Sequence, residues 1–461
     1  MIRLFKHYIP HTVLLFWLCD LALLLLAGDL AWHIRAMQID IDAGYWYDRV
    51  LPILGFAIVC SLSMVAIGLY SPEALRSPRY AFARSLVALS LAGIALAVID
   101  FMLPTMGFWR STLLYALGLA AVLIGVIRVG LSHAVDRERF KRRVVVLGAG
   151  SRAARLKALA AQEDSGFVIT SFIAMSKAHQ ILPEAIARED IGDLGAHVAR
   201  QRGAELVLAL EERRNALPLG DLLRVRTRGI PVHEVSSFLE RETGRVDLDT
   251  LNPSWLIFSE GFSAGRLWSS IAKRSFDIAV GSLLLILSLP VIALFAVLVK
   301  LDSKGPAFFR QQRVGLYGRP FWVLKLRSMR TDAEKDGAKW ACENDPRITR
   351  LGRFIRKVRI DELPQTWSVI KGEMSFVGPR PEVPHFVNDL EDKLPYYAER
   401  HMVKPGITGW AQINYPYGAS IEDARHKLEY DLYYAKNYTP FLDLLILLQT
   451  LRVILFPEGA R

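Results

Sequence analysis

Hydrophobic positions are concentrated in the first third of the chain, whereas the remainder alternates between apolar and charged segments. Apolar stretches cover residues of about 12–34, 50–70, 84–103 and 111–133. Each approaches or exceeds the roughly 20 residues that a helix needs to cross a bilayer. We therefore predict a transmembrane bundle of four helices within residues 1–136. Basic residues flank both ends of this bundle, so both ends are predicted to face the cytoplasm.

A fifth apolar stretch, Phe276 to Val299, has basic residues on both sides. Pro290 lies inside it and lacks an N–H, so the helix is expected to bend there. Ser288 could donate a hydrogen bond to one of the carbonyls freed at the bend. We predict a re-entrant helix over residues 276–299 that enters and leaves the membrane on the cytoplasmic face. A kinked helix that spans the membrane is the alternative.

The middle of the chain, residues 137–268, is predicted to be a cytoplasmic α/β domain of Rossmann type. Four buried-strand runs support this: Arg143–Leu147, Phe167–Ala174, Glu205–Leu210 and Ile230–Glu234. The first run leads into Gly148-Ala-Gly150-Ser-Arg-Ala153, a turn that can bring backbone N–H groups to a phosphate. The second run is not followed by the carboxylate that would bind a ribose. We therefore favour a plain strand-to-helix connection and keep a bound nucleotide as the alternative.

Composition narrows the class of partner. The formal net charge is +11, while 52% of the residues are hydrophobic. No nucleic-acid module is recognisable, so we exclude nucleic acid and expect an anionic membrane surface or a phosphorylated substrate. The three cysteines lack paired or metal-like spacing, which is typical of a reduced, cytoplasm-facing protein.

An acidic pair, Asp361 and Glu362, follows a run of cations and precedes Pro364. Proline is favoured in the first helical turn, so the pair is predicted to stand where a helix begins. The partial positive charge there keeps carboxylates ionised and attracts phosphate. An ionised carboxylate can attack phosphorus, and Mg²⁺ bridging it to a diphosphate would screen the repulsion. Taken alone, the pair is better explained as a helix cap beside a solvated basic face.

Six short motifs occur in order in the last part of the chain. They are Lys273-Arg-Ser-Phe-Asp277, Gly305-Pro-Ala-Phe-Phe309, Lys325-Leu-Arg-Ser-Met329, Asp361-Glu-Leu-Pro-Gln365, Val377-Gly-Pro-Arg-Pro381 and Pro405-Gly-Ile-Thr-Gly409. Together they resemble the bacterial sugar transferase family, the catalytic domain of the monotopic phosphoglycosyl transferases. The whole layout resembles the large polyprenyl glycosylphosphotransferases of exopolysaccharide, capsule and O-antigen synthesis.

The resemblance implies roles for the matching residues. Asp361 corresponds to the nucleophile that forms a covalent phosphosugar intermediate, Glu362 is its partner, and Mg²⁺ binds at this pair. Further substrate-binding residues are predicted to be Lys325, Arg327, Arg353, Arg356, Arg380 and Gln412. Pro290 matches the helix-breaking proline of a re-entrant hairpin, although the family's usual Ser-Pro pair is separated here into Ser288-Leu-Pro290.

The implied activity is transfer of a sugar-1-phosphate from a UDP-sugar to undecaprenyl phosphate, which releases UMP. The implied architecture is a membrane helical bundle, a Rossmann-like domain and a mixed α/β monotopic catalytic domain over residues 269–461. Such a protein would sit among the lipids of the bacterial inner membrane, as a monomer or a homodimer, with its catalytic domain facing the cytoplasm. The sugar stays open, with glucose or galactose favoured by analogy. The competing functions are a membrane-bound nucleotide-sugar dehydratase or epimerase and a non-catalytic scaffold of polysaccharide assembly.

The final apolar segment, residues 441–456, is short for a membrane span. We interpret it as an interfacial helix that seats the catalytic domain, with a buried core helix as the alternative.

Overall fold

The computed structural model describes residues 2–4, 7–71, 74–75, 77–102, 108–134, 141–163, 165–176, 180–211, 217–251, 267–333, 345–416, 418 and 420–455. The chain forms two compact units, one comprising Met1–Gly125 with Leu256–Arg461 and the other comprising Val126–Trp255. The predicted boundary between residues 136 and 137 lies outside the described residues, as does Cys342. The boundary predicted between residues 268 and 269 falls within the first turn of a long helix.

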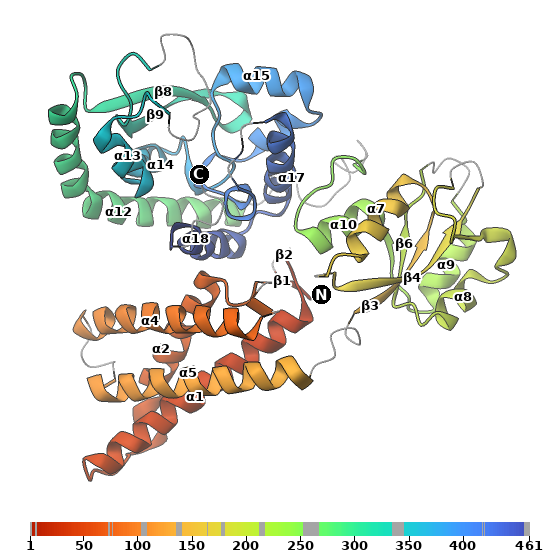
Figure 1. Cartoon of the computed structure of the whole chain (residues 1–461), viewed down its shortest axis with the longest axis horizontal. Coiled ribbons are helices and arrows are strands. Elements are labelled where there is room, and N and C mark those ends of the chain that lie inside the picture. Colours follow the sequence, from red (N-terminus) through yellow and green to blue (C-terminus); the bar gives the residue numbers. More distant parts are fainter. Residues whose placement is uncertain are drawn as a thin grey trace. The chain divides into compact units, whose positions relative to one another are not determined.

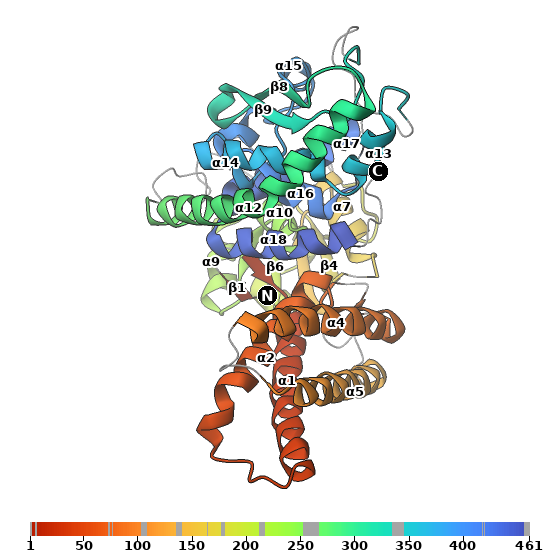
Figure 2. The ribbon, with the colours of Figure 1, turned by 90° about the vertical axis from the view of Figure 1, so that its left-hand side faces the viewer.

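The four apolar stretches near the N-terminus are helices, as predicted (Figure 2). They are α1 (His11–Gln38), α2 (Trp46–Ile67), α4 (Pro78–Met102) and α5 (Arg110–Ala134), preceded by a short hairpin of β1 (Ile2–Leu4) and β2 (His7–Ile9). Each of the four helices contains a segment that is long and apolar enough to cross a membrane. Large apolar side chains remain exposed along them, which is expected of surfaces that face lipid. The chain is therefore a membrane protein.

The middle unit is built on a five-stranded parallel sheet with the strand order β5-β4-β3-β6-β7. The strands are β3 (Arg142–Leu147), β4 (Phe167–Ala174), β5 (Ile186–Ala187), β6 (Glu205–Leu208) and β7 (Val232–Glu234). In chain order this is 3-2-1-4-5, the arrangement found around the first strand of a Rossmann sheet. The predicted α/β domain is thus confirmed, with its four predicted strands in place.

Helices cover both faces of this sheet (Figure 1). Side chains of α7 (Ser151–Ala160) and α10 (Val235–Thr243) join the apolar core on one face. Side chains of α8 (Leu194–Arg200) and α9 (Leu219–Thr227) join the core on the other face, and a short 3-10 helix, η2 (Arg188–Asp190), precedes α8. The strands are nearly continuous hydrophobic runs because both of their faces are buried.

The carboxylate of Glu211 occupies the glycine turn after β3. A Cβ at Gly148, where φ is +135°, would lie 2.2 Å from the carbonyl oxygen of Ala209, so only glycine fits there. Glu211 Oε1 accepts hydrogen bonds from Ser151 Oγ at 2.8 Å and from the backbone N–H of Arg152 at 3.0 Å. These groups lie at the N-terminus of α7, where a nucleotide phosphate would bind in a Rossmann site. The favoured interpretation, a structural connection, agrees with this geometry.

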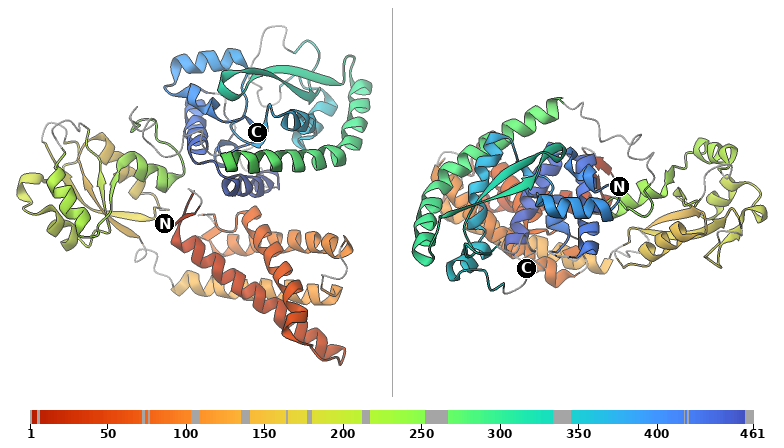
Figure 3. Two further views of the ribbon diagram at one scale, coloured as in Figure 1. Left: turned by 180° about the vertical axis from the view of Figure 1, so that it is seen from behind. Right: turned by 90° about the horizontal axis from the view of Figure 1, so that it is seen from above.

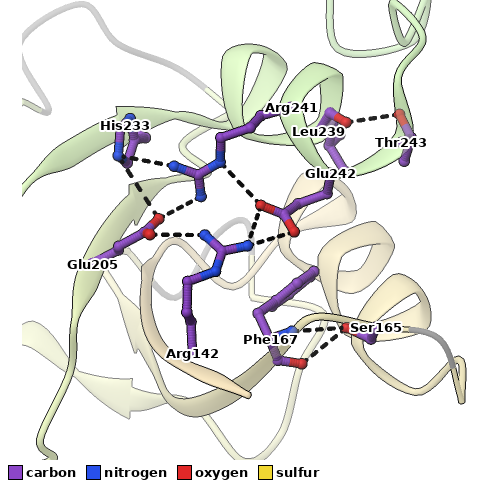
Figure 4. Close-up of polar contacts among 9 residues, drawn as sticks. All are labelled: Arg142, Ser165, Phe167, Glu205, His233, Leu239, Arg241, Glu242 and Thr243. Carbon is purple, nitrogen blue, oxygen red and sulfur yellow. Dashed lines mark hydrogen bonds and ion pairs between the residues drawn. The ribbon is translucent and has the colours of Figure 1, made fainter. Parts of the chain in front are cut away.

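A network of alternating charges ties α10 to the sheet (Figure 4). Arg142 donates to Glu205 at 2.8 Å and to Glu242 at 2.5 and 2.6 Å. Arg241 in turn pairs with Glu205 at 2.5 Å and Glu242 at 3.0 Å, and its Nη1 lies 3.3 Å from His233 Nε2. Each carboxylate therefore meets two guanidinium groups, which compensates for their partial burial.

The last part of the chain begins with α12 (Leu267–Asp302), a 36-residue apolar helix that contains Pro290. Figures 1 and 3 show it as two helical legs that meet at a sharp bend, as the proline predicted. Near the bend, Ser288 Oγ donates to the carbonyl of Leu285 at 3.3 Å. Most of the large apolar side chains of α12 are exposed.

A mixed α/β fold follows α12. Its strands form an antiparallel hairpin of β8 (Phe308–Val314) and β9 (Pro320–Leu326), joined by η3 (Leu316–Gly318), and a parallel pair of β10 (Ser375–Val377) and β11 (Gly406–Thr408). Its helices are α13 (Arg350–Lys357), η4 (Ile360–Gln365), α14 (Thr366–Lys371), α15 (Pro384–Lys393), η5 (Tyr397–Met402), α16 (Trp410–Asn414), α17 (Ile421–Asn437) and α18 (Pro440–Leu455). The predicted C-terminal helix is α18. It buries Leu442 and Ile446 and exposes Leu444, Leu451 and Ile454, so it has one packed and one open face.

Candidate active site

The acidic pair is held at the start of a short helix, as predicted. Thr349 Oγ1 accepts from the N–H of Gly352 at 2.9 Å and caps α13. Two residues after α13 ends, Arg359 adopts a left-handed conformation with φ of +60°, which is uncommon for a residue other than glycine. This turn redirects the chain into the 3-10 helix η4, whose first turn carries Asp361 and Glu362.

Glu362 is a carboxylate surrounded by cations, with 12% of its side chain exposed. Its Oε1 lies 3.3 Å from Lys325 Nζ and 3.1 Å from Arg380 Nη2, and its Oε2 lies 3.7 Å from Arg359 Nη1. Burial alone would raise the pKa of Glu362, but the charges of Arg380, Lys325 and Arg359 outweigh burial and hold the pKa well below its usual range. Glu362 is therefore ionised at neutral pH.

Asp361 is less fully compensated. Only 8% of the residue is exposed, and its Oδ1 has no hydrogen-bond partner within the part of the chain that the structure describes. Burial and the negative charge of Glu362 raise the pKa of Asp361, and the nearby cations do not fully reverse this. A buried oxygen without a donor is costly unless a ligand supplies a partner. Asp361 therefore favours the approach of a cation or an electrophilic centre.

Both carboxylates line a cavity of about 550 Å³. Its basic residues are Arg313, Lys325, Arg327, Arg330, Arg356, Arg359, Arg380, Arg400 and Lys427. The other acidic residues in its wall are Glu382 and Asp431, and its aromatic residues are Phe308, Phe309, Phe386 and Tyr397. The volume is typical of a site for a cofactor or substrate, and the excess of cations indicates an anionic ligand.

The structure brings together most, but not all, of the predicted substrate-binding residues. Lys325, Arg356 and Arg380 line the cavity beside the acidic pair. In contrast, Arg353 is exposed and Gln412 is half-buried, and neither lies among the residues that line the cavity. Gln412 Nε2 instead donates to the carbonyl of Ile407 at 3.0 Å.

Arg327 also lines the cavity, but its guanidinium is engaged by backbone carbonyls of α12 and the residues just after it. Nη1 donates to the carbonyl of Lys304 at 3.0 Å, and Nη2 donates to the carbonyls of Ser303 at 2.7 Å and Val299 at 3.3 Å. These carbonyls belong to the C-terminal end of α12 and the residues just after it. The geometry favours a structural role for Arg327, which joins α12 to β9 two residues from Lys325.

Several cavity residues were not singled out from the sequence. Arg400 donates to Asp431 Oδ2 from Nε at 3.0 Å and from Nη2 at 2.7 Å, and its Nη1 donates to the hydroxyl of Tyr397 at 2.8 Å. Burial raises the pKa of that hydroxyl to about 12, so Tyr397 stays protonated. Arg313 follows the motif Gly305–Phe309 and Arg359 precedes the motif that begins at Asp361, so both could have been found from their closeness to these motifs. Arg400 and Asp431 belong to none of these motifs.

The residues present fit a Mg²⁺ ion that takes some of its ligands from the protein and the others from a bound substrate. In the described part of the chain no group of three or more His, Cys, Asp or Glu side chains could hold a metal ion. Asp361 and Glu362 supply carboxylate oxygens, and Asp361 Oδ1 still lacks a partner there. Mg²⁺ typically binds through one or two carboxylates together with substrate phosphates and water.

Comparison with known proteins agrees with this site. The bacterial sugar transferase model matches residues 268–457, which include α12 after its first residue and the whole cavity lining. The region is 45% identical over 193 residues to the uncharacterized sugar transferase EpsL of Bacillus subtilis, and the match covers 41% of this chain and 90% of that protein. The chain belongs to the bacterial sugar transferase family.

Other members of the sugar transferase family extend beyond the matched region. The UDP-N-acetylgalactosamine-undecaprenyl-phosphate N-acetylgalactosaminephosphotransferase of Aeromonas hydrophila is 43% identical over 244 residues, covering 52% of this chain and 56% of that protein. The undecaprenyl-phosphate glucose phosphotransferase of Komagataeibacter xylinus is 42% identical over 199 residues, covering 42% of this chain and 37% of that protein. The matches thus span about half or less of the length of these two sugar transferases.

Proposed function

We propose that this sugar transferase moves a sugar-1-phosphate from a UDP-sugar to undecaprenyl phosphate and so initiates exopolysaccharide or O-antigen synthesis. The observation that carries this proposal is the buried Asp361, whose Oδ1 lacks a hydrogen-bond partner among the described residues of a cation-lined cavity. The substrate classes come from the names of two relatives, which contain UDP-N-acetylgalactosamine and undecaprenyl phosphate in one case and glucose and undecaprenyl phosphate in the other.

In the first half-reaction, a carboxylate oxygen of Asp361 attacks the phosphorus that carries the sugar. The bond between this phosphorus and the bridging oxygen of the diphosphate breaks, and UMP leaves with the electron pair. Lys325, Arg356 and Arg380 line the cavity beside the dyad and neutralise the charge that builds up on the phosphate oxygens. Glu362 fixes Lys325 and Arg380 through its ion pairs.

Asp361 and Glu362 would hold Mg²⁺, which when bound supplies positive charge to the diphosphate. In the second half-reaction, a phosphate oxygen of undecaprenyl phosphate attacks the same phosphorus. The bond to Asp361 breaks and its carboxylate is regenerated, leaving undecaprenyl diphosphate linked to the sugar. Each half-reaction transfers the phosphosugar without a change in oxidation state, so no oxidant or reductant is needed.

We also propose that α12 is re-entrant, because both of its ends are fastened to the same fold. Near its start, Lys273 Nζ donates to Asp443 Oδ2 in α18 at 2.6 Å. At its other end, Arg327, which follows β9, donates to the carbonyls of Val299 in α12 and of Ser303 just after it. A helix crossing the roughly 30 Å hydrocarbon core would place these ends on opposite sides. Since nucleotide sugars and the basic flanks of α12 belong on the cytoplasmic side, the catalytic domain over residues 269–461 is proposed to face the cytoplasm of a bacterial inner membrane.

The dehydratase or epimerase alternative needs a bound nucleotide cofactor in the middle domain, residues 137–268. Glu211 fills the N-terminus of α7 at its glycine turn, which disfavours that alternative. The scaffold alternative leaves the unpartnered Oδ1 of Asp361 without an explanation.

The test uses the full-length protein in membranes with Mg²⁺ and a panel of labelled UDP-sugars. Without undecaprenyl phosphate, the correct UDP-sugar should release no more than about one UMP per enzyme and leave its labelled phosphosugar on the protein. Adding undecaprenyl phosphate should transfer the label to the lipid phase. Asp361→Asn should abolish both signals, whereas Asp389→Asn, at a carboxylate on α15 that lies outside the cavity lining and has a side chain 45% exposed, should retain them. Normal turnover by Asp361→Asn would refute the proposal.

A further inference from the structure

Helix α13 has two chemically different faces. Gly352 and Ile355 are buried against the catalytic fold, and Arg356 lines the cavity. On the opposite face all five residues are exposed: Arg350, Arg353, Phe354, Lys357 and Val358 at the helix's end. This outward face, defined by those five residues, therefore combines three cations with two apolar side chains. It includes Arg353, which the sequence placed among the substrate contacts.

The outward face is continuous with the apolar surface of α12. The ring of Phe354 stacks on that of Phe295, with centroids 6.1 Å apart and planes inclined by 16°. Phe295 lies on the part of α12 that follows Pro290, where Leu294 and Val297 are 57% and 58% exposed. Phe354 itself is 52% exposed. If this part of α12 lies in lipid, Phe354 reaches the bilayer surface beside it.

The charge of the outward face is uncompensated within the described structure. Arg350, Arg353 and Lys357 form no ion pair with a described residue, and α13 contains no acidic residue. Two further exposed lysines, Lys300 and Lys304, stand where α12 ends. Each cation at the cytoplasmic surface of a membrane raises the binding constant for anionic lipids by about tenfold or less. Apolar side chains among such cations are typical of helices that lie in the interface.

We propose that the outward face of α13 binds the headgroups of anionic phospholipids at the cytoplasmic surface of the membrane. This rests on the re-entrant insertion of α12 proposed above. The contact would fix α13 at the membrane surface, so that Arg356 on its inner side and the cavity are held at the level where a lipid phosphate arrives. Arg353 then contacts the bilayer rather than the nucleotide sugar.

The test is photocrosslinking of the full-length protein in nanodiscs of phosphatidylcholine with or without phosphatidylglycerol. Benzoyl-phenylalanine replaces Phe354 in one protein and Leu223, which is 63% exposed on α9, in a control. We expect lipid adducts at position 354, enriched in phosphatidylglycerol over its share of the bilayer. Arg353→Gln with Lys357→Gln should lower that enrichment by about fivefold, and Arg200→Gln with Arg226→Gln, the same charge change on α8 and α9, should leave it unchanged.

Each contrary outcome has its own meaning. Lipid adducts without preference for phosphatidylglycerol, or a preference that survives loss of both cations, would overturn the proposal. Adducts to a second copy of the chain or to another part of the same chain would show that protein covers this face, and would overturn it too. UMP release without undecaprenyl phosphate, measured in detergent, reports the proposed enzyme activity separately. Loss of UMP release in Asp361→Asn would concern the enzyme activity only, so the lipid crosslinking result would be judged separately.

Discussion

Lys325 interacts electrostatically with both carboxylates of the site. Burial and the charges of Arg380 and Arg313 lower the pKa of Lys325, and the charges of Glu362 and Asp361 offset this only in part. The ion pair with Glu362 fixes the Lys325 nitrogen at the site, where one fixed donor has a large effect on a phosphoryl transition state. We expect Lys325→Met to slow UMP release by about 100-fold or more.

Two variants make this prediction specific. Lys325→Arg keeps the positive charge but replaces a compact ammonium by a planar fork, so it should be intermediate. Arg319→Gln, an exposed cation at the turn of the same hairpin, should behave as the wild type. Single-turnover UMP release is the measurement, and a Lys325→Met enzyme with normal release would assign the phosphate contact to the arginines instead.

His401 links the stability of the catalytic fold to pH. It is buried, and burial together with the charge of Arg400 lowers the pKa of its imidazole from 6.5 to about 3. In the unfolded chain this histidine takes up a proton below about pH 6.5, whereas in the folded protein it does not until about pH 3. Stability should therefore fall as the pH drops through this window, on the order of 2 kcal/mol between pH 7 and pH 5.

Thermal unfolding of the purified protein at pH 7 and pH 5 tests this coupling. His401→Phe removes the titrating group, so the loss of melting temperature between the two pH values should be smaller than in the wild type. Substitution of the exposed His385 should leave the difference as it is. An unchanged pH difference in His401→Phe would show that His401 does not control it.

At the residue level, local motifs predicted the acidic pair and three cations beside it, but not the whole cavity wall. The cation run before Asp361 contains both Arg353 and Arg356, and the packing of α13 decides which one faces the cavity. Arg400 and Asp431 meet across 31 positions, so their pairing depends on how α17 packs against η5. The residues adjacent to each of them in the sequence do not indicate such a contact.

Among the elements, the glycine turn of the middle unit gives a sharp prediction. Glu211 accepts hydrogen bonds from the hydroxyl of Ser151 and the N–H of Arg152 at the start of α7. It therefore caps this helix although it lies far from it in the sequence. Glu211→Ala should therefore destabilise the middle unit by about 1 kcal/mol. Adding NAD or a UDP-sugar should not raise the melting temperature of this unit in an Asp361→Asn background.

Hydrogen exchange of peptides from residues 141–163 reports on this unit within the intact protein. Faster exchange in Glu211→Ala, with Glu184→Ala on the same unit as a control, would support the capping role. Glu184 pairs with Lys157 in the middle of α7 and does not reach the helix N-terminus. Protection of these peptides by a nucleotide in the wild type would contradict the conclusion that the turn is structural.

Elements with a strong hydrophobic pattern were predictable, and those without one were not. The parallel strands of the middle unit are largely apolar runs and were found, except the two-residue β5. The short parallel pair of β10 and β11 was not assigned. The hairpin of β8 and β9 was not assigned, because Arg310, Gln311, Gln312 and Arg313 place polar side chains on both of its faces. Without a period of two in hydrophobicity, a strand resembles a basic loop.

For the whole molecule, the decisive property is the path of α12 through the membrane. The helix has 36 residues, enough to span, so its length does not distinguish a hairpin from a crossing. The polar contacts of both ends with one fold favour the hairpin. If the helix straightened, these contacts would have to break at one end. Either the half-buried Lys273 or the buried Arg327 would then lose its hydrogen-bond partners there.

Cysteine labelling in a background without native cysteines tests the path of α12. Ser270→Cys and Asp302→Cys place single thiols at exposed positions near its two ends, and Asp42→Cys marks the loop after α1. A membrane-impermeant maleimide should label both α12 positions in inverted vesicles and neither in spheroplasts, whereas position 42 should behave oppositely. If Pro290 sets the bend, Pro290→Leu should allow part of the population to straighten, so that one α12 position becomes accessible from the outside. Opposite labelling of positions 270 and 302 in the unmodified helix would mean that α12 crosses the membrane, and the acidic pair would then lie away from cytoplasmic UDP-sugars or be detached from one end of its membrane helix.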